Sequence, residues 1–135
     1  MANTQAISGI MKQVALAAVV DGKSLKAALY LVSATTNGTN TAYTATGEVS
    51  GTNYAAGGVS VTNANSAGLT STTAFWTPSA SITYTTVTLS TAFDAVMIYS
   101  TTDTNRNVGV FTFGSQTVTA GTFTIVWNAS GIFAL

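Results

Sequence analysis

The side chains able to take part in acid–base or metal chemistry are few in this sequence. Among 135 residues there are four acids, Asp21, Glu48, Asp94 and Asp103, and there is no His and no Cys. The chain therefore lacks a Ser–His triad, a thiolate nucleophile and the usual zinc ligands. The acids are scattered, without the alternating Asp spacing of a calcium loop. We expect a non-enzymatic protein with no cofactor and no metal; glycoside hydrolysis, which needs only two carboxylates, remains formally open.

The basic residues are equally few and do not indicate a nucleic-acid partner. They are Lys12, Lys23, Lys26 and Arg106, and the formal net charge is 0. Affinity for a duplex comes largely from neutralising several phosphates, which this set cannot do well. No apolar run approaches the roughly 20 residues of a membrane-spanning helix. We therefore expect neither nucleic acid nor membrane as a partner.

Low charge is the most unusual property of the composition. Charged residues make up 6% of the chain and hydrophobic residues 47%, whereas an average soluble domain is about 25% charged. Exposed strand edges normally carry Lys or Pro against unwanted pairing, but this chain has one Pro, and Arg106 is its only basic residue beyond position 26. The pattern is typical of a subunit that is packed in an assembly through sheet edges and apolar termini.

Near the N-terminus the sequence predicts one helix, over residues 4–21. Asn3 or Thr4 can cap its free N–H groups, and Gly22 suits the position after its end. Apolar side chains recur every three or four residues and form one stripe. The stripe consists of Ile7, Ile10, Met11, Val14 and Ala17/Ala18. Such a helix either closes one end of a sheet core or docks on a neighbouring subunit.

The remainder, residues 25–135, is predicted to be all β. Short alternating segments separated by turn residues favour a single β-sandwich or jelly-roll-like domain. A phase shift at Thr85-Thr86 indicates a bulge, and the unbroken apolar run Ala95–Tyr99 is typical of a central strand covered on both faces. The other expected strands are Leu25–Val32, Thr72–Thr77 before Pro78, Val108–Phe113 ending at a turn at Gly114, and Thr122–Trp127.

Some apolar side chains could either pack within the protein or bind a partner. Trp76, Trp127 and Phe133 are either core residues or interface anchors, because aromatic residues are enriched at interface hot spots. The apolar end Ile132–Leu135 is unfavourable in water and is expected to pack on the body or on a partner. Asp103 and Arg106 are expected to pair across the polar loop 100–107.

Several segments resemble a family of small structural proteins of tailed bacteriophages and prophages. The resemblance covers about residues 5–128 and is most specific over Tyr43–Gly58. The segments that carry it are Leu25–Tyr30, Thr41–Gly58, Ala95–Ser100, Val110–Gly114 and Thr119–Trp127. It implies a virion component and no catalytic residue. We favour a capsid decoration (cement) protein on the capsid exterior, because one domain without a coiled coil suits a subunit that caps capsomers.

This resemblance implies protein partners: the major capsid protein or another virion protein, and further copies of the chain in a homo-oligomer such as a trimer. Glu48 is then either a clamp to a neighbour or a charge on a local turn, and Lys23 and Lys26 either contact an acidic capsid surface or are solvated. The candidate interface residues are Lys23, Lys26, Tyr43, Glu48, Tyr54, Trp76, Ile132, Phe133 and Leu135. The alternatives are a tail or fibre component, or a carbohydrate-binding module with Tyr43, Tyr54 and Trp76 exposed as a flat cluster.

Overall fold

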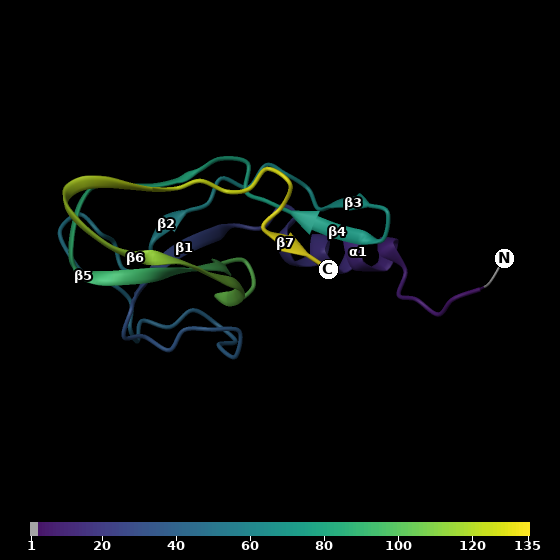
Figure 1. The fold of residues 1–135 in the computed structure, drawn as a ribbon, viewed down its shortest axis with the longest axis horizontal. Helices are drawn as coiled ribbons and strands as arrows, with labels where there is room; N and C mark the ends of the chain where they lie inside the picture. The colour runs from purple at the N-terminus through teal and green to yellow at the C-terminus, as the bar shows by residue number, and fades with distance from the viewer. Residues whose placement is uncertain (1–2) are drawn as a thin grey trace.

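A long antiparallel hairpin forms the centre of the fold. The computed structural model describes residues 3–135, and in it β5 (Ile82–Ser100) pairs with β6 (Arg106–Ile125). On its other edge β5 pairs with β1 (Leu25–Leu31), which is followed by the short β2 (Val59–Ser60), so that the sheet order is β2-β1-β5-β6. Figure 1 shows this sheet at one end of an elongated molecule.

A second, smaller sheet lies at the other end of the molecule. It contains β3 (Gly68–Thr70), β4 (Thr73–Trp76) and β7 (Phe133–Ala134) in the order β3-β4-β7. The helix α1 (Gly9–Val20) packs against β3 and β4, and the C-terminus lies beside them (Figure 1). The mainly β, sandwich-like fold and the single N-terminal helix within residues 3–135 confirm the predicted fold class.

Both faces of the large sheet are covered where β1 meets β5. On one face, Ala27 and Leu29 join the main core; on the other, Ala28 and Tyr30 pack with Ala95, Met97 and Tyr99. Alternate residues of a strand point to opposite faces, so a strand that is covered on both sides has no polar phase. This explains why Ala95–Tyr99 is continuously apolar, and it confirms the predicted central strand.

The hairpin confirms one prediction about its strands and contradicts another. The bulge is where it was predicted, because the register shifts between Tyr84 and Val87, and Thr86 has a φ of 51°. However, the predicted strands on either side of Gly114 are parts of the single strand β6, and the expected turn there is wrong. β5 is long enough to pair with the whole of β6. Bulges bend the two strands, so the chain curves without a turn at Gly114.

The helix prediction was right in kind but wrong in its start and in its buried face. The helix begins at Gly9, and Ser8, not Asn3 or Thr4, occupies the capping position without a side-chain hydrogen bond. Residues 3–8 are exposed and lack packing partners that would support another helical turn, and short unsupported helical segments are marginal in water. The buried side chains are Leu16 and Val20, whereas most of the predicted stripe faces solvent.

Candidate functional site

Glu48 is the centre of a polar cluster in which its carboxylate accepts hydrogen bonds from its own chain. Its Oε2 accepts a hydrogen bond from the Tyr43 hydroxyl at 2.6 Å. Its Oε1 accepts from the Tyr54 hydroxyl at 2.8 Å and from the Gly57 backbone N–H at 2.7 Å. Charge-assisted hydrogen bonds of this kind are stronger than neutral ones. Glu48 thus clamps its own chain, and the predicted alternative of a local charge describes its position better than an ion pair to a neighbour.

The backbone around Glu48 explains why it points into this cluster. Residues 47–49 continue the line of β2 along the edge of β1: the Leu31 N–H donates to the Gly47 carbonyl at 2.9 Å, and the Val49 N–H donates to the Leu29 carbonyl at 3.0 Å. Val49 is buried in the core. Since neighbouring residues of an extended chain face opposite sides, burying Val49 turns Glu48 to the opposite face, where Tyr30 lies across from it.

All five tyrosines of the chain belong to this neighbourhood. The Tyr54 hydroxyl, besides donating to Glu48, accepts the Leu29 N–H at 2.9 Å. The hydroxyls of the other three tyrosines donate to backbone carbonyls, and the rings of Tyr43 and Tyr99 stack at 4.8 Å. These three bonds join Tyr30 to Thr44 at 2.6 Å, Tyr84 to Ala27 at 2.7 Å and Tyr99 to Gly57 at 2.7 Å. Together they tie the loop over residues 42–58 to β1 and β5.

Burial and the nearby carboxylate make these phenols weaker acids. Burial raises the pKa of Tyr30 to about 12, with a further contribution from the Glu48 charge. Burial, followed by the hydrogen bond to Glu48, raises the pKa of Tyr43, and the pKa of Tyr54 and of Tyr84 is raised mainly by burial. Burial also raises the pKa of Tyr99. The cluster therefore holds its phenols protonated, as donors, far above neutral pH.

The sequence analysis singled out Glu48, Tyr43 and Tyr54 but missed Tyr30, Tyr84 and Tyr99. A signal was available: Glu48 is the only charged residue between Lys26 and Asp94, and all five tyrosines lie within residues 30–99. A carboxylate that is partly buried needs hydrogen-bond donors. The tyrosines are the side chains there that combine an apolar body with a strong donor.

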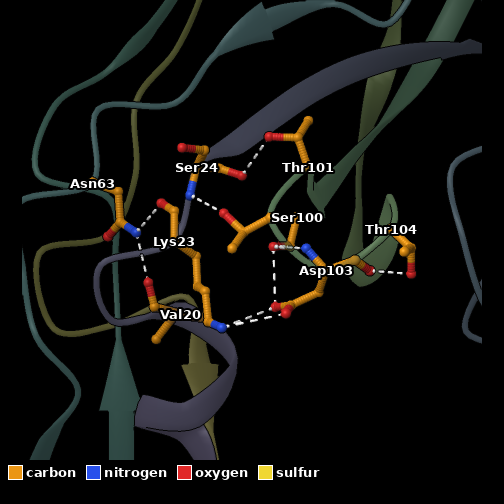
Figure 2. Close-up of polar contacts among 9 residues, drawn as sticks. Val20, Lys23, Ser24, Asn63, Ser100, Thr101, Asp103 and Thr104 are labelled. Atoms are coloured by element: carbon orange, nitrogen blue, oxygen red, sulfur yellow. Dashed lines mark hydrogen bonds and ion pairs between the residues drawn. The ribbon is translucent and has the colours of Figure 1, made fainter.

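Lys23 forms an ion pair that sequence reasoning assigned to a different residue. Its Nζ lies 3.3 Å from Asp103 Oδ2, and this is the one ion pair in residues 3–135. Figure 2 shows the Lys23 side chain extending toward the loop between β5 and β6, where Asp103 also accepts from the Ser100 hydroxyl at 3.2 Å. The predicted Asp103–Arg106 side-chain pair is therefore wrong. The segment just before β1 places Lys23 beside this loop, and the Asp103 carboxylate pairs with Lys23 in place of Arg106.

The same corner is held by backbone and amide contacts. The Ser24 N–H donates to the Thr102 hydroxyl at 3.0 Å, and the Thr101 hydroxyl donates to the Ser24 carbonyl at 3.0 Å. The Asn63 amide donates to the carbonyls of Val20 at 2.6 Å and Lys23 at 2.9 Å (Figure 2). The charge and hydrogen bond of Lys23 lower the pKa of Asp103 despite partial desolvation, which opposes the change. This corner joins the helix to the hairpin turn.

The remaining candidate residues divide between the core and the surface. Trp76 is buried, with its indole N–H donating to the Asn65 carbonyl at 3.2 Å. Phe133 stacks on Trp76 at a centroid distance of 5.9 Å, and Ile132 is half-buried, while Leu135 is exposed. Lys26 is half-buried beside Gly57. The expected flat exposed cluster of Tyr43, Tyr54 and Trp76 is therefore not formed, since Trp76 belongs to the core and the Tyr54 hydroxyl is engaged by its own chain.

The surface hollows do not bring acids together. Four hollows of about 220 to 450 Å³ on the part of the chain from residue 3 onward are lined without any Asp, Glu, Lys or Arg. The largest of these four lies beside Phe75 and Ala134 on the small sheet. Within the described residues no three metal-ligating side chains gather, and none of the helices there is long and apolar enough to cross a membrane.

Comparison with known proteins adds no relative to this description. The chain matches no family model, no curated protein and no solved structure.

Proposed function

We propose that this protein is a structural virion subunit: a capsid decoration protein that binds the outer surface of the major capsid protein and stabilises the shell. The observation that carries a structural role is the exposure of large apolar side chains at one end of a nearly uncharged chain. Ile10, Met11 and Val14 are exposed on the helix, and Leu135 is exposed beside the small sheet. Apolar side chains three and four residues apart on a helix form one patch, and an exposed apolar patch marks an interaction site. The proposal that the protein belongs to a virion rests on the phage-family resemblance over residues 5–128.

The arrangement of Glu48 supports a scaffold role over a catalytic one. Both of its carboxylate oxygens accept hydrogen bonds from the same chain. A general base or nucleophile has to face a substrate within hydrogen-bond reach, and for Glu48 this would mean breaking the clamp on the 42–58 loop. We therefore propose that the protein acts by binding other proteins and not by catalysing a reaction.

The two alternative functions have different support. A tail or fibre component would use the same apolar surface, so it differs from the main proposal only in its partner. A carbohydrate-binding module needs exposed aromatic faces near polar groups, and burial of Trp76 removes the ring on which we expected a sugar to stack. The sugar-binding alternative accordingly has no support from the three residues chosen for it.

Sedimentation with shells tests the proposal. Purified protein is mixed with empty shells of the major capsid protein from the same phage or prophage, and the pelleted fraction is measured against added protein. We expect saturable binding at a fixed copy number per capsomer. Binding to purified tails in place of shells would replace the capsid proposal by the tail alternative, and binding to neither would overturn both.

Two single-charge variants sharpen this experiment. Lys26→Ala removes the half-buried lysine next to Gly57, whereas Arg106→Ala removes the exposed arginine at the start of β6. If Lys26 contacts an acidic shell surface as the sequence suggests, only Lys26→Ala weakens binding. Equal loss in both variants would mean that Lys26 makes no specific contact with the shell.

A further inference from the structure

The helix α1 has apolar side chains on two faces, and only one of these faces is covered. Leu16 and Val20 are buried against the body of the protein. On the other face Ile10, Met11 and Val14 are 58%, 53% and 62% exposed, and Ile7, just before the helix, is 59% exposed. We call these four residues the α1 stripe. An amphipathic surface helix normally turns such a stripe toward the core.

The helix cannot rotate to bury the stripe, because its other face is held in place. The Lys12 ammonium donates to the Thr72 carbonyl at 3.2 Å, and the Gln13 amide donates to the Ala67 carbonyl at 3.0 Å. At Gly9 the helix approaches the turn after β3 so closely that an added Cβ would lie 2.9 Å from the Ser71 carbonyl oxygen. The stripe is therefore preorganised and faces outward.

We propose that a second copy of this chain covers the α1 stripe, with the two helices packed antiparallel about a twofold axis. This inference rests on the proposed role as an assembly subunit and names one of its contacts. The stripe is self-complementary: its centre falls between Ile10 and Met11, so an antiparallel partner places its Val14 against Ile7 and its Ile10 against Met11. A twofold contact requires such a self-complementary patch.

Charge favours a second copy over a charged partner. The only charged residue of α1 is Lys12, whose ammonium is engaged by the Thr72 carbonyl, and the formal net charge of the chain is 0. Two copies therefore meet without like-charge repulsion. Antiparallel packing also places the positive end of each helix dipole beside the negative end of the other. A partner with a charged surface would find no ion-pair partner along the stripe.

The small size of the stripe predicts a weak contact. A 12-residue helix is only about 18 Å long, and four partly exposed side chains on each copy bury far less than the roughly 1,600 Å² of a standard interface. We therefore expect a rapidly exchanging dimer in free solution. The contact becomes important where many copies are held side by side at high local concentration.

Sedimentation velocity over a wide range of protein concentrations, with a matched pair of variants, tests this interface. Val14→Glu places a charge in the stripe. Val126→Glu places the same charge at another exposed valine, which is 78% exposed beyond the end of β6. We expect the wild type and Val126→Glu to shift toward dimer with increasing concentration, and Val14→Glu to stay monomeric. Circular dichroism would verify that both variants are folded, as expected for exposed positions.

Cross-linking gives a second, independent readout. The chain has no Cys, so a single introduced thiol reports one contact only. Under mild oxidation we expect Ile10→Cys or Met11→Cys, next to the proposed axis, to form disulfide-linked dimers at least about tenfold faster than Val126→Cys, because a disulfide requires close Cα atoms. Equal rates at all three positions would overturn the proposal.

The outcomes separate this interface from the proposed function. A chain that stays monomeric at every concentration, or self-association that persists in Val14→Glu, overturns the helix pairing whether or not shells are bound. A monomeric wild type whose binding to shells is lost in Val14→Glu would show that the shell, not a second copy, covers the stripe. Self-association that depends on Val14 without any binding to virion parts would sustain the interface and overturn the virion role.

Discussion

The hydroxyl of Tyr54 lies 2.8 Å from Glu48 Oε1, and this contact joins two residues within the segment most specific to the phage-family resemblance. The same hydroxyl accepts the N–H of Leu29 in β1. A single phenol therefore connects the carboxylate, the 42–58 loop and the large sheet. Because the oxygen is both donor and acceptor, removing it leaves the Leu29 N–H without this acceptor and takes one of three hydrogen-bond donors from Glu48.

Tyr54→Phe should destabilise the fold more than removal of an ordinary hydroxyl would. Leaving a buried donor or acceptor unsatisfied costs about 1–3 kcal/mol, and here the Leu29 N–H and Glu48 are both affected. Tyr43→Phe is the matched control, since the Tyr43 hydroxyl contacts Glu48 but receives no backbone N–H. Urea unfolding would measure both, and a larger loss for Tyr43→Phe would contradict the proposed connection.

Glu48→Ala should lower the free energy of unfolding by about 3 kcal/mol, because three donors lose their acceptor at once. Glu48→Gln keeps one carbonyl oxygen and should lose about 1 kcal/mol. Chemical unfolding at neutral pH measures the difference. If the two variants are equally stable, the carboxylate is not the element that holds the loop.

Stability should fall at alkaline pH. The pKa of Tyr30 is raised to about 12 in the folded protein, above the value of about 10 for an unfolded chain, and the pKa values of the other four tyrosines are also raised. The folded state thus holds these protons more tightly than the unfolded state. The stabilisation is complete below about pH 10 and is lost as the pH rises through 10 toward 12. Thermal unfolding across this range, with tyrosinate absorbance as the second signal, should show unfolding and ionisation together. Ionisation of all five tyrosines at the ordinary value without unfolding would contradict the prediction.

Gly58→Ala should be among the most damaging single changes in the chain. Gly58 has a φ of 78°, and an added Cβ would collide with the Ala27 carbonyl and lie 2.8 Å from the Ala28 Cα in β1. Gly22→Ala is the control, because Gly22 also has a positive φ, 66°, but faces open space. We expect a loss of about 1 kcal/mol for Gly22→Ala from backbone strain alone and several-fold more for Gly58→Ala. Comparable melting temperatures for the two variants would show that β1 yields to the added methyl group.

The C-terminal segment should stabilise the fold through Phe133 and not through Leu135. Phe133 packs against Trp76 and against Phe111 at 5.2 Å, and truncating a packed Phe costs about 3 kcal/mol. Leu135 is exposed, so Leu135→Ala should change stability by less than about 0.5 kcal/mol. Deletion of residues 132–135 should therefore weaken folding at least as much as Phe133→Ala. If the deletion is harmless, β7 is not needed for the small sheet.

The sequence predicted those features that depend on local pattern. Alternation and apolar runs identified the strands around Ala95–Tyr99 and the bulge near Thr86, because these depend on which neighbours a residue has along the chain. The pairing of Lys23 with Asp103 could not be predicted in this way, since 80 residues separate the two. Which face of α1 is buried was decided by the close approach at Gly9 and by the amide of Gln13, not by the hydrophobic stripe.

The sheet order also determines when the chain is able to fold. β1 pairs with β5 in a register that places Leu25 opposite Ser100, and β4 pairs with β7, which begins at Phe133. During synthesis β1 therefore remains without β5 until residues 82–100 have been made, and β4 remains without β7 until residues 133 and 134 have been made. Pairings between such distant segments fold slowly. A nascent chain would expose strands with very few charges throughout that interval. We therefore expect its yield to be most sensitive to chaperones and to expression temperature.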